Sequence, residues 1–301
     1  MSIGIPDLTA VRARHPEAIA EAAGRRVRRP LLGAGGRLMI VAADHPARGA
    51  LGVGDRRLAM ANRADLLERL CTALSRPGVD GVLATADVLE DLLLLGVLDG
   101  KVVMGSMNRG GLAGAAFELD DRFTGHRAKD LARLRFDAGK LLLRIDYDDP
   151  GSPATLESAA RAVDAMAARR LPVFVEPFLC RRSEGRLRTD LSAEAVTRSI
   201  AIASGLGGTS AYTWLKLPVT RDPDDMAEVL ETSTLPAVLL GGDVGGTGGS
   251  DGAGDAREAV YERWRKALRL PTVRGLVAGR SLLYPARGTV EEAVDTAVGL
   301  L

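Results

Sequence analysis

Lys216 is the residue in this chain whose type and surroundings most clearly allow covalent chemistry. It lies in the apolar run Tyr-Thr-Trp-Leu-Lys-Leu-Pro-Val at residues 212–219, where loss of water disfavours the ammonium form and lowers the lysine pKa. A neutral amine is a nucleophile that forms a Schiff base with a carbonyl substrate. The alternative is a lysine at a strand end whose stem is buried and whose ammonium reaches water. Lysine is also a rare choice here, since the 40 basic residues include only five lysines: Lys101, Lys129, Lys140, Lys216 and Lys266.

A second lysine, Lys140, begins another apolar run that carries further ionisable groups. If this run is a strand, Lys140, Arg144 and Asp146 share one face by period-two alternation and point into the same space. A cation beside Lys216 would lower the pKa of that amine further by like-charge repulsion. Arg144 and Asp146 are then candidates for substrate binding. Lys140 also fits a charged residue at the bottom edge of the strand.

Three more residues are candidates for proton transfer or orientation of the substrate. Glu176 lies in the run Phe-Val-Glu-Pro-Phe, where apolar neighbours would raise the carboxyl pKa toward the range useful for acid–base catalysis. A buried Glu176 could equally be a structural partner of Arg144 or Lys140. Tyr147, which follows Asp146, is the second acid–base candidate. Asp44 directly follows an apolar run and could orient a substrate hydroxyl, pair with a lysine or cap the next loop.

Glycines followed by polar groups end the last two apolar runs. Glycine lets backbone N–H groups approach an anion closely, a following helix adds a favourable dipole, and arginine binds phosphate with two hydrogen bonds. In (β/α)8 barrels the usual phosphate site follows strands seven and eight. We therefore predict phosphate binding by Gly241, Gly242, Gly279, Arg280 and Ser281.

The sequence predicts neither a metal site nor an organic cofactor. His15, His45 and His126 are far apart in the sequence, and no His-Glu-x-x-His or Cys-x-x-Cys motif occurs. Cys71 and Cys180 are too few and too distant for a disulfide framework. The charged segment at residues 120–126, which includes His126, could be a loop that covers the substrate, but a solvated turn is the preferred interpretation.

Eight short apolar runs, most of them followed by a helical pattern, are expected to position these residues. Such strands are typical of a parallel sheet covered on both faces, and eight of them suggest closure into a barrel. The runs are residues 38–43, 81–84, 102–104, 140–145, 172–176, 211–217, 237–241 and 275–278. An open, doubly wound sheet is the alternative architecture.

One-sided helical patterns separate several of these runs. Apolar residues recur at i, i+3 and i+4 spacing over residues 57–74, 152–169, 192–204 and 255–268. With no linker or change in composition, the chain is predicted to be a single α/β domain over residues 1–301, a (β/α)8 TIM barrel. Residues 1–35 are expected to form a helical N-terminal extension that caps the bottom of the barrel.

Composition excludes several classes of partner. Hydrophobic residues make up 46% and charged residues 26% of the chain, as in soluble globular proteins. A formal net charge of +1 gives no field strong enough to favour nucleic acid or an anionic membrane. Neither a signal peptide nor a run of about 18 apolar residues is evident, so we expect a cytoplasmic protein with a small-molecule substrate.

Five of these segments together resemble the class I aldolases of the DeoC/LacD group. They are Asp44-His45, the segment Asp-Ala-Gly-Lys-Leu-Leu at 137–142, Val175-Glu176-Pro177, Leu-Lys-Leu-Pro-Val at 215–219, and Ala278-Gly279-Arg280. That group includes tagatose-bisphosphate, sulfofructose-phosphate and archaeal-type fructose-bisphosphate aldolases. The individual motifs are short, but their order along most of the chain is specific.

The resemblance implies roles for the candidate residues. Lys216 would be the Schiff-base lysine, Glu176 an acid–base group, Lys140 its cationic neighbour and Asp44 a substrate-orienting carboxylate. Gly279 and Arg280, with Gly241 and Gly242, would hold the phosphate. The family analogy also implies a homo-oligomer.

The substrate implied by the resemblance is a phosphorylated keto sugar or keto acid, cleaved to dihydroxyacetone phosphate and an aldehyde. This chain departs from the tagatose type, because Gly-Gly-Asp at 241–243 replaces a Ser-Ala-Gly pattern. It also looks like an actinobacterial branch associated with inositol catabolism, for which the substrate would be 5-dehydro-2-deoxygluconate 6-phosphate and the aldehyde malonate semialdehyde. Tagatose or fructose bisphosphate and sulfofructose phosphate are alternative substrates.

Two other functions fit the same residues. One is a phosphate-binding barrel isomerase or lyase in which Lys216 acts only as an electrostatic clamp. The other is a non-catalytic protein that binds a sugar phosphate.

Overall fold

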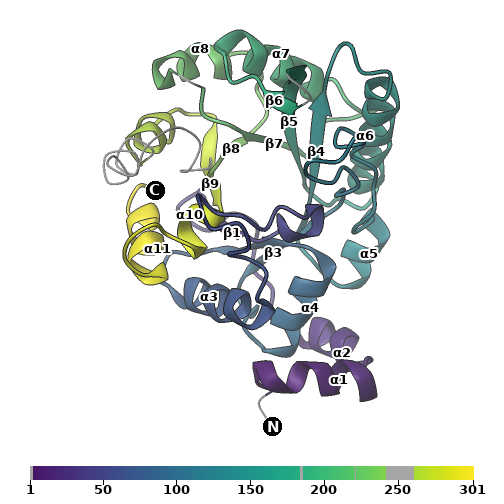
Figure 1. Cartoon of the computed structure of the whole chain (residues 1–301), viewed down its shortest axis with the longest axis vertical. Helices are drawn as coiled ribbons and strands as arrows, with labels where there is room; N and C mark the ends of the chain where they lie inside the picture. Colours follow the sequence, from purple (N-terminus) through teal and green to yellow (C-terminus); the bar gives the residue numbers. More distant parts are fainter. Residues whose placement is uncertain (1–2, 184–185, 221, 242–260) are drawn as a thin grey trace.

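Eight parallel strands close into a barrel, which confirms the predicted (β/α)8 fold (Figure 1). The structure is a computed structural model that describes residues 3–183, 186–220, 222–241 and 261–301. The last barrel strand pairs with the first, so the open doubly wound sheet is excluded. In order around the barrel the strands are β1 Leu38–Ala42, β2 Gly81–Ala84, β3 Val102–Ser106, β4 Ala138–Ile145, β5 Val173–Ser183, β7 Thr213–Leu217, β8 Ala237–Leu240 and β9 Val273–Ala278.

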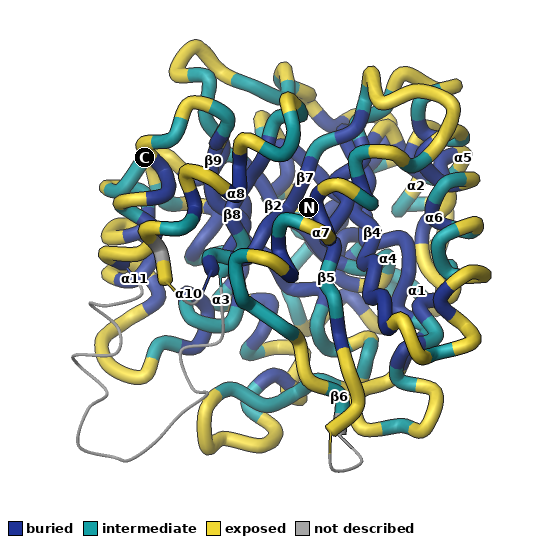
Figure 2. Tube along the Cα trace, turned by 90° about the horizontal axis from the view of Figure 1, so that it is seen from above, coloured by how far each residue is buried: buried dark blue, intermediate teal, exposed yellow. Residues whose placement is uncertain are grey.

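The strands are buried on both faces, which explains why they read as nearly continuous apolar runs (Figure 2). Alternate residues point inward and form a small apolar cluster that includes Ile40, Met104, Phe174 and Val238. The residues between them point outward and pack against the helices in a larger cluster. The barrel is therefore filled by side chains in its lower part and is not a pore.

The helices surround the barrel (Figure 1). Three are fixed by caps that the sequence provides, because Asn62, Ser192 and Thr289 accept hydrogen bonds from backbone N–H groups in the first turn. The cap at Asn62 explains why the first predicted helix starts at residue 63 and not at 57. The helices are α3 Arg63–Ser75, α4 Ala86–Leu94, α5 Ala128–Arg133, α6 Ser152–Ala167, α7 Ala193–Ser204, α8 Met226–Leu230, α10 Arg280–Leu283 and α11 Val290–Val298. Of the helix predicted at 255–268, residues 261–267 are helical and residues 255–260 lie outside the described part.

The N-terminal segment differs from the predicted helical cap. Its two helices, α1 Leu8–Arg14 and α2 Ala18–Arg25, lie on the flank of the barrel beside α4 (Figure 1). The irregular segment that follows them closes the bottom, where Leu31 and Leu32 pack against the interior cluster. A pair of leucines is small enough to fill the narrow barrel end, which a whole helix of about 10 Å diameter is not.

The fifth strand runs beyond its predicted end. A proline normally ends or borders a strand, but β5 continues through Pro177 to Ser183 and forms an antiparallel hairpin with β6 Arg186–Thr189. The neighbouring strand β7 pairs with β5 only up to Val175, so Pro177 interrupts no ladder on that side. The hairpin projects from one end of the barrel (Figure 2). Within the described residues, no helix is both long and apolar enough to cross a membrane.

Candidate active site

Three of the predicted residues meet inside the barrel, on the adjacent strands β4, β5 and β7. Lys140 is level with Phe174 and Trp214 in the strand register. Glu176 and Lys216 each lie two residues further along their strands, nearer the C-terminal mouth of the barrel. Lys140 is 1% exposed and Lys216 is 6% exposed. Lys216 is therefore the amine closer to an entering substrate, and Lys140 lies one layer below it.

Glu176 joins the two lysines. One carboxylate oxygen pairs with the Lys140 ammonium and the other with that of Lys216. Asp44, directly after β1, lies 3.4 Å from Lys140 Nζ. The structure thus brings together all four residues to which the resemblance gives catalytic roles, apart from the phosphate-binding set. This arrangement can keep one lysine amine in its neutral, unprotonated form and hold a carboxylate within reach of it.

Arg109, which the sequence analysis did not select, completes the cluster. It follows β3, is 7% exposed and forms an ion pair with Asp44. Its Nε donates to Ser106 Oγ at 3.2 Å, and that hydroxyl donates to Asp44 Oδ2 at 3.3 Å. The signal in the sequence was the polar segment Ser-Met-Asn-Arg at 106–109, because polar residues directly after a barrel strand lie at the functional end.

Burial is the main reason why both amines lose protons easily. It lowers the pKa of Lys140 well below its usual value, and the Arg109 cation lowers it further. Burial also lowers the pKa of Lys216, although its pairing with Glu176 opposes this effect. Both directions favour the neutral, nucleophilic form of a lysine.

The pKa of Glu176 shifts opposite to the prediction. Burial by itself raises this pKa, but the two adjacent lysines outweigh burial and bring the pKa below its usual range. The prediction from apolar sequence neighbours was wrong because the residues that contact Glu176 come from two other strands. Glu176 is therefore an anion that accepts hydrogen bonds or a proton, and it does not hold a proton at neutral pH.

Arg144 points inward from β4, as predicted, but it is held by the loop that follows β3. It donates to Asp121 at 3.0 Å through Nε and at 2.5 Å through one terminal nitrogen, and it also contacts Glu118. Asp121 and His126 are almost completely buried, whereas Arg122, Thr124 and Gly125 are exposed. The segment at 120–126 is therefore only in part the solvated turn that the sequence predicts. Asn108 fixes the same loop through two hydrogen bonds of 2.6 Å with the backbone of Leu142.

Asp146 and Tyr147 lie apart from the lysine cluster. Asp146 is buried in the turn before α6, where its backbone N–H donates to the Ser152 hydroxyl and its carbonyl accepts from the same hydroxyl. Tyr147 is 64% exposed and interacts with Arg198 on α7. The structure therefore gives both residues contacts on the outer side of the barrel mouth.

The residues predicted to bind phosphate lie at the ends of β8 and β9, except Gly242, which is outside the described residues. Gly241 and Gly279 are required for packing, since a Cβ on Gly241 would lie 2.6 Å from that of Ala278 and one on Gly279 would collide with the Ala42 carbonyl. Burial lowers the pKa of His45, and Arg280, which starts α10, is close enough to lower it further. The buried Oγ of Ser281 has no hydrogen-bond partner among the residues that the structure describes.

The comparisons with known proteins agree with this architecture. A family model described as Cgl0159-like matches residues 36–298. The chain belongs to the Cgl0159-like family. The crystal structure of Cgl0159 from Corynebacterium glutamicum (Brevibacterium flavum) is 50% identical to it with a TM-score of 0.91, over 99% of this chain and 97% of that chain. No curated protein matches it significantly.

More distant structures share the barrel fold with this Cgl0159-like protein. A Schiff-base-forming fructose-1,6-bisphosphate aldolase is 18% identical with a TM-score of 0.62, over 94% of this chain and 98% of that chain. An archaeal fructose 1,6-bisphosphate aldolase is 17% identical with a TM-score of 0.64 and the same coverage. The family match spans every residue of the charged cluster, from Asp44 to Lys216.

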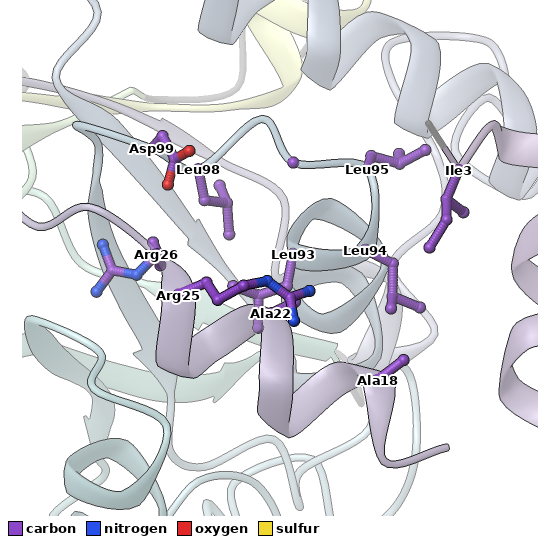
Figure 3. A pocket seen from close by; sticks show the side chains of 11 residues that line it. Ile3, Ala18, Ala22, Arg25, Arg26, Leu93, Leu94, Leu95, Leu98 and Asp99 are labelled. Carbon is purple, nitrogen blue, oxygen red and sulfur yellow. The ribbon is translucent and has the colours of Figure 1, made fainter. Parts of the chain in front are cut away.

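The charged cluster of this Cgl0159-like chain lies at the C-terminal mouth of the barrel. In the described ranges, no group of three or more His, Cys, Asp and Glu residues could hold a metal ion. A cavity of about 300 Å³ lies at the opposite end, between α2 and the end of α4 (Figure 3). Its lining combines leucines with Arg25, Arg26 and Asp99 and brings no lysine or carboxylate pair together.

Proposed function

We propose that this protein is a class I aldolase that cleaves a phosphorylated keto sugar or keto acid through a Schiff base on Lys216. The observation that carries the proposal is the Glu176 carboxylate shared by two buried lysines, of which Lys216 lies nearer the mouth. A structural ion pair needs only one lysine and one carboxylate. A second buried lysine on the same carboxylate is not needed for such a pair. Two such cations repel each other and favour loss of a proton from one of them.

The reaction follows from these positions. The neutral Lys216 amine adds to the substrate carbonyl to form a carbinolamine, which takes up a proton and loses water to give a protonated imine. A carboxylate, for which Glu176 is the nearest candidate, takes the proton of the β-hydroxyl, and the C–C bond breaks. The bonding electrons move into the imine and form an enamine as the aldehyde leaves. Protonation of the enamine carbon and addition of water then release dihydroxyacetone phosphate and the free amine.

Other members of the cluster would orient the reactants. Lys140 holds Glu176 as an anion, and Asp44 faces the same interior space, where it can accept a hydrogen bond from a substrate hydroxyl. Arg280 and Ser281, with the glycines that end β8 and β9, would bind the phosphate. The unpartnered Ser281 hydroxyl supports this placement.

For the substrate we propose 5-dehydro-2-deoxygluconate 6-phosphate, with fructose or tagatose bisphosphate and sulfofructose phosphate as alternatives. All of them place a carbonyl and a phosphate within one molecule. The fructose-bisphosphate aldolases that share the fold support the general substrate class.

The test is a cleavage assay with the full chain and a panel of these phosphorylated substrates. Release of dihydroxyacetone phosphate is followed by its enzymatic reduction. We expect cleavage of at least one substrate by the wild type, none by Lys216→Met, and normal cleavage by Lys129→Met, whose lysine is exposed. Unimpaired cleavage by Lys216→Met, or by Lys216→Arg, would indicate an electrostatic clamp and refute the Schiff base. No release from any substrate would refute the proposed reaction.

A further inference from the structure

Arg109 ends a row of five charged side chains that alternate in sign across the barrel mouth. The order of contacts is Arg109, Asp44, Lys140, Glu176 and Lys216, with Asp44 shared by Arg109 and Lys140 and Glu176 shared by the two lysines. Each member is at most 7% exposed. Water therefore screens these charges weakly, and each must be compensated by an opposite charge within the cluster.

The number of charges in this row determines how many protons the lysines hold. With both lysines protonated, three cations face two anions. Loss of one lysine proton makes the row neutral. Arg109 cannot be the group that loses the proton, because burial lowers its pKa only to about 10 and guanidinium stays charged at neutral pH.

Among the residues that the structure describes, the surrounding charged groups do not change this count, since Arg48 is paired with Glu118. Arg144, the next cation on β4, is paired with Asp121 and Glu118. His45, beside Asp44, is neutral because burial and the nearby Arg280 and Lys216 cations lower its pKa. Arg280 lies on the β9 side of the mouth, in the proposed phosphate site, and donates weakly to the Gly52 carbonyl at 3.5 Å.

We propose that Arg109 is a positioning residue that keeps the Lys216 amine unprotonated by neutralising Asp44 in place of a lysine. Without Arg109, Asp44 would need Lys140 as its counter-ion and Glu176 would need Lys216, so both lysines would retain their protons. The inference rests on the proposed function in one respect, namely that the neutral Lys216 amine is used as the nucleophile. The hydroxyl of Ser106 holds the two partners in place, since it accepts from Arg109 and donates to Asp44.

The experiment measures the protonation of Lys216 directly, without any aldolase substrate. The full chain is treated briefly with trace acetic anhydride at a series of pH values, and acetylation of Lys216 is quantified by peptide mass spectrometry. Because only the neutral amine reacts, the midpoint of the pH profile reports the amine pKa. Exposed Lys129 is the internal control, with a midpoint that no variant changes.

Four variants separate the expected outcomes. Arg109→Gln removes a cation and moves the Lys216 midpoint to higher pH by about one unit or more, whereas Arg109→Lys retains the charge and the wild-type midpoint. Asp44→Asn removes an anion and moves the midpoint to lower pH. The double variant Asp44→Asn/Arg109→Gln removes one charge of each sign and restores the wild-type midpoint.

An unchanged midpoint in Arg109→Gln would overturn the inference. If that variant does not fold, as judged by circular dichroism, Asp44→Asn and the charge-compensated double variant decide the question. An upward shift in Asp44→Asn, or none, would also overturn it. Shifts in the expected directions, in a wild type that cleaves no substrate, would remove the proposed function and leave the electrostatic role of Arg109 in place.

Discussion

At the scale of single residues, the candidate site depends on charges that are buried together and cannot all be satisfied. Glu176 contacts two lysines, and Asp44 contacts a lysine and an arginine. Removing one partner of a buried pair leaves an uncompensated charge, which costs about 3–5 kcal/mol or moves a proton. In this cluster a lysine ammonium can lose its proton, and the neutral amine that results is the nucleophile.

Replacing Lys140 by methionine tests this dependence. Glu176 would then pair with Lys216 alone, so the Lys216 pKa would rise. The acidic limb of the pH–rate profile for cleavage would move to higher pH by about one unit. Since the rate follows the neutral fraction of the amine, activity on the acidic side would fall about tenfold. The pH profile of kcat/KM measures the shift. Lys129→Met, which changes an exposed lysine, should leave the limb unmoved, and an equal profile for Lys140→Met would contradict the account.

The sequence indicates the members of this cluster that lie within strands. An apolar run on both sides of Lys216 and Glu176 reveals that they are buried, and strand alternation places Lys140 on an inward face. Arg109 and Asp121 lie in a loop, where no periodic pattern predicts burial, and their roles depend on contacts with β1 and β4. The direction of the Glu176 pKa could not be predicted for the same reason, because it is determined by residues from other strands.

At the scale of elements, close contacts between strands fix the barrel mouth. Gly279 follows β9 and packs against the last residue of β1, Ala42, leaving no room for a Cβ. Ala42 cannot retreat, because β1 is paired with β2 on one side and β9 on the other. The glycine that the sequence suggested for phosphate binding is thus also required for barrel closure.

We expect Gly279→Ala to destabilise the protein by about 1–3 kcal/mol, as overpacking of a rigid site does. Gly24→Ala is the matched control, since Gly24 lies within α2 and a Cβ there meets nothing within 4 Å. That control should be neutral or stabilising by up to about 1 kcal/mol, because alanine favours helix. Denaturant unfolding of both variants measures the difference, and equal stability would show that the contact at Ala42 is relieved without cost.

The sequence predicts the eight barrel strands well because each is a continuous apolar run that must be buried on both faces. It does not predict the β5–β6 hairpin, since residues 177–189 contain a proline and several arginines and resemble a loop. It also misplaces the N-terminal helices, whose apolar stripes are too small to show which surface they cover.

At the scale of the whole molecule, the two ends of the barrel have different tasks. The C-terminal mouth carries the lysine cluster. At the other end, Asp137 receives hydrogen bonds from Arg26 at 3.1 Å, Arg28 at 2.8 Å and the Val103 backbone at 2.9 Å. These bonds attach the N-terminal segment to the start of β3 and β4, so this end serves stability.

Asp137→Asn should therefore destabilise the fold by about 3–5 kcal/mol, because it leaves the buried Arg26 cation uncompensated. Asp295→Asn is the control, since its ion pair with Arg76 lies on the surface, where solvent screening leaves it little effect on stability. Equilibrium unfolding in urea compares the two. Similar losses in both variants would mean that the N-terminal segment is not held by Asp137.

The most direct test of the central claim is to trap the Schiff base. The full chain is incubated with dihydroxyacetone phosphate and reduced with borohydride, and the modified peptide is identified by mass spectrometry. We predict one stable adduct, on Lys216, that is absent from Lys216→Met and present in Lys129→Met. An adduct on Lys140, or none on either lysine, would contradict the account.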